Sequence, residues 1–93
     1  MTTQVYHQLP LTPTQEIALC RELMHEAAEV LLREDAYLRD VPGAEEDRPT
    51  DAQYSRAYRV YEQGRRRVRE LENDLQAEAD AQARAVRRTA RLA

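Results

Sequence analysis

The chain has 93 residues, no Phe or Trp, and a formal net charge of −3 at pH 7. This length has room for one small domain, whose apolar surface stays partly wet unless the chain oligomerises. No apolar run approaches the roughly 18 residues of a membrane span, and Met1 to Leu11 lacks the basic start and apolar core of a signal peptide. Because Cys20 is the single cysteine, no disulfide framework can form within the chain, and we expect a cytoplasmic protein.

The charge is divided unevenly along the chain. Residues 1–55 carry eleven acidic side chains and four arginines, whereas residues 56–93 carry ten arginines and six acidic side chains. The segment from Gln82 to Ala93 holds four arginines and no acid. All the basic residues are arginine, whose planar guanidinium can bind carboxylate and phosphate groups in a bidentate manner. A purely basic segment of this kind suggests a surface presented to a partner.

The first predicted helix covers about residues 12–39. Thr12 can cap it, Pro13 suits the first helical position, and Gln15 completes a capping box. The helix should end near Arg39, because the following Asp-Val-Pro-Gly sequence stops a helix. Its apolar residues recur at helical spacing and form a broad stripe: Ile17, Leu19, Cys20, Leu23, Met24, Ala27, Ala28, Val30, Leu31 and Leu38.

The second predicted helix follows an acidic loop from Ala44 to Pro49. Thr50 and Gln53 repeat the capping-box pattern, so this helix should cover about residues 51–78. No strong breaker follows, and the helix can continue to about Thr89 as a basic overhang within residues 79–93. The stripe is strong at Tyr54, Ala57, Tyr61, Gly64, Val68, Leu71 and Leu75, and weak at Ala79, Ala83, Val86 and Ala90.

These elements predict an all-α fold, an antiparallel two-helix hairpin over residues 12–78 with an N-terminal arm at residues 1–11. Matching the helix ends at the loop places residues whose numbers sum to about 90 opposite one another. Gly64 would then face Ala27 and Ala28, and Leu75 would face Ile17. Two helices bury a single seam, so we expect self-association, most simply into a four-helix bundle or a coiled-coil-like oligomer.

No pattern in the sequence predicts catalysis or a cofactor, so we expect a protein that is not an enzyme. Glu22 and His25 have the Glu-x-x-His spacing of carboxylate metal sites in helical bundles, and Glu62 could supply a facing ligand. The helical wheel places Glu22 and Glu29 opposite the apolar stripe and His25 at its polar edge. This placement favours solvated side chains, and we expect no bound metal. For Tyr54, Tyr58 and Tyr61 we expect core positions rather than a binding site, because aromatic residues at helical spacing are usually packed.

The arginines fall into two groups. The middle group, from Arg65 to Arg69, spreads around the helix and has acidic neighbours at Glu62, Glu70 and Glu72, so we expect it to be paired. The terminal group falls within about 100° of the helical wheel, roughly opposite the weak apolar stripe. It consists of Arg84, Arg87, Arg88 and Arg91.

The sequence therefore predicts a small protein–protein interaction module, acting as an adaptor, regulator or inhibitor. The expected contact surfaces are the terminal arginines and the apolar face of the first helix at Leu19, Leu23 and Val30. An alternative is a nucleic-acid-associated protein that uses the arginines as a phosphate clamp, although four charges give only weak, salt-sensitive binding. Docking on a membrane is not expected, because the apolar side of the overhang is mostly alanine.

Overall fold

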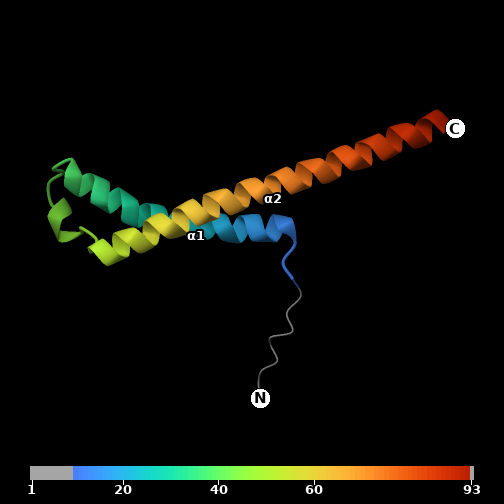
Figure 1. The fold of residues 1–93 in the computed structure, drawn as a ribbon. Helices are drawn as coiled ribbons and strands as arrows, with labels where there is room; N and C mark the ends of the chain where they lie inside the picture. Colours follow the sequence, from blue (N-terminus) through green and yellow to red (C-terminus); the bar gives the residue numbers. More distant parts are fainter. Residues whose placement is uncertain (1–9, 93) are drawn as a thin grey trace, which may run out of the picture.

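Two helices account for most of residues 10–92, the part of the chain that the computed structural model describes (Figure 1). Helix α1 spans Pro13–Leu38 and helix α2 spans Asp51–Leu92, with a short 3-10 helix, η2, at Ala44–Glu46 between them. The two long helices pack against each other in antiparallel directions, and residues 10–92 contain no strand. The predicted all-α hairpin with a longer second helix is confirmed. The predicted arm at residues 1–11 lies almost entirely outside the described residues.

Both long helices begin with the predicted capping boxes. In α1 the Gln15 amide donates to the Thr12 hydroxyl at 3.1 Å, and the Thr12 amide donates to the Gln15 side chain at 3.0 Å. In α2 the corresponding bonds join Gln53 and Thr50 at 3.1 and 2.8 Å. Each box satisfies backbone donors that have no partner inside the helix, which fixes where the helix starts.

Helix α1 ends in a Schellman motif. The Val41 amide bonds to the Ala36 carbonyl and the Asp40 amide bonds to the Tyr37 carbonyl, each at 3.1 Å. Asp40 has a φ of 57°, the left-handed conformation that this motif requires and that aspartate tolerates better than most side chains. Gly43, with a φ of 81°, then turns the chain into η2.

Arg48 fastens the connection between the helices to α1. Its guanidinium donates two hydrogen bonds to the Glu34 carboxylate, at 3.0 and 3.3 Å, and lies 3.9 Å from the centroid of the Tyr37 ring. The hydrogen bond to Glu34 raises the pKa of Arg48. A bidentate ion pair combined with a cation–π contact holds the loop against the last turns of α1.

The core is a narrow seam between α1 and α2. Ile17, Val68 and Leu71 form its buried cluster, against which Cys20, Met24 and Leu75 pack while remaining partly exposed. Leu75, which was predicted to face Ile17, packs against the cluster that contains Ile17. Toward the loop the buried positions of the seam are occupied by small residues, Ala27 and Ala57.

The register of the seam differs from the prediction at Gly64. A Cβ atom added to this glycine would lie 2.6 Å from Cγ of Met24 and 3.6 Å from the Cys20 carbonyl oxygen. The prediction that Gly64 faces Ala27 and Ala28 is therefore wrong by about one helical turn. The physical reason is that the long, flexible Met24 side chain fills the space over the glycine, a gap that alanine could not fill.

The last part of α2 extends beyond the hairpin (Figure 1). Leu75 is the last residue of α2 that is partly buried, and every residue from 76 to 92 is exposed. We call residues 76–92 the overhang; at 1.5 Å per residue it is about 25 Å long. Both long helices exceed the length of a bilayer span, but neither contains a segment apolar enough to cross one, within residues 10–92.

The stability of the hairpin should depend on the Leu71 cluster. Leu71 is 4% exposed, so Leu71→Ala leaves a cavity in the tightest part of the seam. We expect it to lower the free energy of unfolding by about 2–3 kcal/mol, measured by urea denaturation followed by circular dichroism. Leu32→Ala is the matched control, because Leu32 is 65% exposed on the side of α1 that faces away from the seam. Its replacement should change the free energy of unfolding by less than about 0.5 kcal/mol. Equal effects of the two substitutions would contradict this view of the core.

Candidate protein-binding surface

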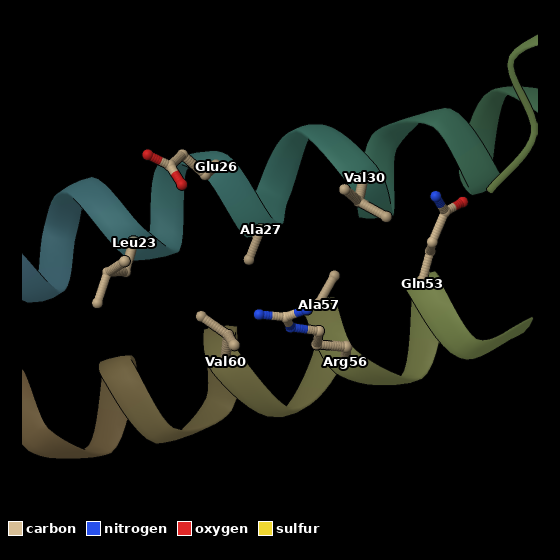
Figure 2. Close-up of a pocket in the computed structure, with 8 residues that line it drawn as sticks. All are labelled: Leu23, Glu26, Ala27, Val30, Gln53, Arg56, Ala57 and Val60. Atoms are coloured by element: carbon tan, nitrogen blue, oxygen red, sulfur yellow. The ribbon is translucent and has the colours of Figure 1, made fainter. Parts of the chain in front are cut away.

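An apolar groove runs between α1 and α2 near the loop end of the hairpin (Figure 2). Its volume is about 290 Å³, and it is open to solvent along its length. Four residues come from each helix: Leu23, Glu26, Ala27 and Val30 from α1, and Gln53, Arg56, Ala57 and Val60 from α2.

Side-chain size explains the position of the groove. The buried floor residues, Ala27 and Ala57, each end at Cβ and cannot fill the space between the helices. Leu23 and Val30 form the α1 wall, and Leu23 remains 45% exposed. Larger side chains close the seam at the other end, so the groove opens only where alanines face each other.

The sequence predicted three apolar contact residues on α1, and the structure separates them. Leu23 and Val30 both line the groove, whereas Leu19 is equally exposed but lies outside it. The groove residues from α2 were not predicted as a contact surface. Ala57 and Val60 could be identified only once the register of the helices was known. An alanine at a seam position gives the same sequence pattern whether neighbouring side chains fill the space above it or leave a groove.

One acidic residue, Glu26, borders the groove on α1. Glu26 lines its edge and its carboxylate points away from α2, as Figure 2 shows. Glu22 and Glu29 are exposed on the same side of α1, and Glu29 lies 3.9 Å from the imidazole of His25. Among residues 10–92, no arginine forms an ion pair with any of these three glutamates. Glu26 is therefore the one acidic residue at the α1 edge of the groove, and Glu22 and Glu29 lie further round the exposed side of α1.

The four terminal arginines gather on one face of the overhang. Their side chains enclose a shallow depression of about 300 Å³ that is lined by no other residue: Arg84, Arg87, Arg88 and Arg91. All four are exposed, and within the described part of the chain none pairs with an acid. The structure thus brings together the arginines that the sequence selected.

Two of the middle arginines, Arg65 and Arg67, differ because they form ion pairs with acidic side chains. Arg67 donates to Glu16 of α1 at 2.6 and 3.1 Å and to Glu70 at 3.2 Å, while Arg65 donates to Glu62 at 2.9 Å. The hydrogen bond to Arg67 lowers the pKa of Glu16, and the same bond raises the pKa of Arg67. The expectation that this run is paired is confirmed for these two arginines, although Glu72 pairs instead with Arg21 of α1 at 2.9 Å.

Two tyrosines form a second exposed feature. Tyr54 and Tyr58 stack with their ring centroids 6.4 Å apart, and they are 37% and 51% exposed. The expectation that they belong to the core is wrong for this pair. The reason is geometric, since a seam between two helices covers only a narrow strip of α2 and Tyr58 lies beside that strip. Together with Ser55 and Arg59 they line a shallow hollow of about 370 Å³.

The candidate metal ligands do not converge. In the described residues no three His, Cys, Asp or Glu side chains lie close enough to hold a metal ion. Glu62 accepts a hydrogen bond from Arg65, and the His25 side chain is 80% exposed. Glu22 and His25 thus remain solvated side chains on the outer side of α1.

A scan against protein-family models, a search of curated proteins and a search of solved structures each gave no match to this chain. The chemistry of its surfaces is therefore the basis for the functional argument below.

The ion pair between Arg67 and Glu16 should make stability depend on pH. Because the pKa of Glu16 is lowered in the folded state, its contribution is present above the unfolded value of about 4.3 and is lost as the pH falls through the folded pKa. We expect Glu16→Gln to lower the Tm at pH 7, and the difference from wild type to close as the pH is reduced below about 4. Thermal unfolding followed by circular dichroism between pH 2 and 7 measures this.

Glu45→Gln is the control for that experiment. Glu45 is exposed in η2 and forms no ion pair within residues 10–92, so its replacement should leave the pH profile unchanged. A Glu16→Gln protein that follows the wild-type profile at every pH would show that the ion pair contributes nothing.

Proposed function

We propose that this protein is a small, non-catalytic helical interaction module that acts in the cytoplasm as an adaptor, regulator or inhibitor by binding a protein partner. The observation that carries the proposal is the open groove between α1 and α2, an apolar channel lined by both helices and bordered by charge. A second copy or another protein could supply the occupant. The lone, half-buried Cys20 suits a reducing compartment.

The groove has the properties of a site for an amphipathic helix. Such grooves combine an apolar floor with polar edges, and they bind the apolar face of a helix through residues at helical spacing. Here the floor is alanine and the walls are Leu23, Val30 and Val60, with Glu26 on one edge and Arg56 on the other. Small floor residues support close approach of an incoming helix, and opposite charges on the edges would orient it.

The terminal arginines support a second candidate function, binding of nucleic acid. Four unpaired guanidinium groups on one face could contact phosphates, and such binding would be steeply salt-dependent. A gel-shift titration in 20 mM salt tests this alternative with wild-type protein and a protein lacking residues 82–93. A shift that needs these residues and disappears at about 200 mM salt would support it. Absence of a shift with wild-type protein would exclude it.

The proposed function is tested by substitution in the groove. Leu23→Glu places a charge on the α1 wall at a position that is already 45% exposed, so the hairpin should still fold. We expect it to reduce binding of the native partner by at least about 10-fold, because a carboxylate would have to be buried on docking. The measurement is affinity capture from the native host followed by titration of the purified partner.

The matched control is Leu32→Glu, which places the same charge on the opposite side of α1 at a 65% exposed residue. It should capture the partner as wild type does, and circular dichroism should show equal helicity for all three proteins. If every captured protein binds the Leu23→Glu and wild-type proteins equally, the groove is not a binding site and the proposal fails.

A further inference from the structure

We infer that the exposed tyrosine patch of α2 is covered by the overhang of a second copy of this chain, in a dimer whose α2 helices pair in antiparallel directions. The site is the surface around Tyr54 and Tyr58, which lies on the other side of the seam from the groove. The inference is therefore independent of the proposed function. It also differs from the four-helix bundle expected from the sequence, because α2 pairs with α2 and the two α1 helices follow one another along one side of that pair.

One continuous face of α2 connects the tyrosines to the overhang. Its positions are spaced three or four residues apart from residue 54 to residue 90, and at about 100° per residue they all fall within about 80° of arc. The end near the loop is aromatic, the middle is mostly polar, and the overhang end is small and apolar. The positions are Tyr54, Tyr58, Tyr61, Arg65, Val68, Glu72, Gln76, Ala79, Ala83, Val86 and Ala90.

Both ends of this face are left uncovered by the hairpin. Tyr54 and Tyr58 are 37% and 51% exposed, and with Ser55 and Arg59 they line the shallow hollow described above. At the other end Val86 is 68% exposed. Val86 lies 28 residues beyond Tyr58 in the same continuous helix, which is about 42 Å, so the two ends of the face can meet only between copies.

The spacing of the face is the same when it is read from either end. A two-fold axis perpendicular to α2 at residue 72 therefore matches each position with one of the partner. Large aromatic side chains then meet alanine and valine, a combination that interdigitates without overpacking. Parallel helices would instead oppose alanine to alanine and leave that end loosely packed. The antiparallel pairs at each end are Tyr54 with Ala90, Tyr58 with Val86 and Tyr61 with Ala83.

The polar middle of the face accommodates the two-fold axis. Glu72 meets its counterpart there, but each Glu72 is already paired with Arg21 of its own α1 at 2.9 Å. Arg69 lies about one turn away and forms no ion pair within residues 10–92, so it adds a positive charge near the partner's Glu72. Because α1 begins at Pro13 and the seam reaches only to Leu75, the two α1 helices lie end to end and meet near their first turns.

Charge favours the antiparallel direction as well. A perpendicular two-fold axis brings the same edge of both α2 helices together, and this edge carries Asp51 at the tyrosine end and Arg91 at the overhang end. Neither residue forms an ion pair in the described part of the chain. In the antiparallel dimer each Arg91 lies within one turn of the partner's Asp51, whereas parallel helices would keep the two apart. Arg84 and Arg88 point away from the partner and stay exposed.

Disulfide trapping tests the predicted contact directly. In a Cys20→Ala background, a Tyr58→Cys protein and a tagged Val86→Cys protein are mixed and mildly oxidised. We expect a disulfide-linked heterodimer on non-reducing gels, because residues 58 and 86 meet only between copies. Ala85→Cys is the matched control: it lies one residue from Val86 on the far side of the overhang and should give little cross-linked product with Tyr58→Cys.

Sedimentation equilibrium tests the face of the overhang. Wild-type protein should be a dimer at micromolar concentration. Ala83→Glu with Val86→Glu should raise the dimer dissociation constant by about 100-fold, because two charges would enter the contact with the tyrosines. Ala81→Glu with Ala85→Glu adds the same charges to the opposite side and should leave the dimer intact. Circular dichroism establishes that both proteins keep their helices.

A charged pair across the contact supplies a rescue that misfolding could not imitate. Tyr58→Glu should weaken dimerisation by at least about 10-fold, because a carboxylate would be buried against Val86. Mixed with Val86→Arg chains it should form a heterodimer, since one contact then joins a carboxylate to a guanidinium and the other keeps the native tyrosine and valine. The control is Tyr58→Glu mixed with wild-type chains. If the first mixture associates no more tightly than the control, the inference is overturned.

Two further outcomes would also overturn it. One is wild-type protein that stays monomeric at about 100 μM. The other is a dimer in which Val86→Cys chains cross-link to each other and not to Tyr58→Cys chains, which would show that the helices pair in parallel.

The groove variant Leu23→Glu separates this inference from the proposed function. Leu23 lies on the other side of the seam from the tyrosine patch, so its substitution should leave the dimer intact while it reduces capture of another protein. Monomeric wild-type protein together with loss of capture by Leu23→Glu would overturn the dimer and leave the proposed function standing. A dimer with the predicted cross-link, together with unchanged capture by Leu23→Glu, would do the reverse.

Discussion

The difference in length between the two helices determines the rest of the structure. Helix α1 begins at Pro13, so the seam extends only as far as Leu75, and α2 continues for a further 17 residues without a neighbour. Two helices enclose only one line of contact, which here contains few fully buried side chains. The hairpin is consequently a protein with a small core, an open groove at one end and an unpartnered helix at the other.

Electrostatic pairing compensates in part for this small core. The pairs Arg67–Glu16 and Arg21–Glu72 connect α1 to α2 at the end where the apolar cluster lies, and Arg48–Glu34 fastens the loop at the other end. These contacts are exposed and individually weak, so they specify the register more than they stabilise the fold. They also use Arg67, whereas the terminal four arginines form a cluster without an ion pair in the described part of the chain.

Local sequence patterns were sufficient for the helices and for the basic surface. Thr12 with Gln15 and Thr50 with Gln53 form capping boxes through hydrogen bonds between near neighbours, and no tertiary information is needed to recognise them. The same holds for the terminal arginines, whose common face follows from the helical period alone. The register failed at Gly64, because counting from the helix ends cannot show which neighbouring side chain, Met24 or Ala27, fills the gap.

The amino-acid sequence by itself therefore determined the two helices, their boundaries, the overhang and the uneven distribution of charge, since each depends on residues close together along the chain. Only the tertiary structure decided that Ala27 and Ala57 leave a groove, that Tyr54 and Tyr58 lie outside the seam, and that Glu16 holds Arg67. The physical reason is that packing depends on how side chains from distant segments interlock, and a shift of one turn changes every contact while leaving the pattern of each helix unaltered.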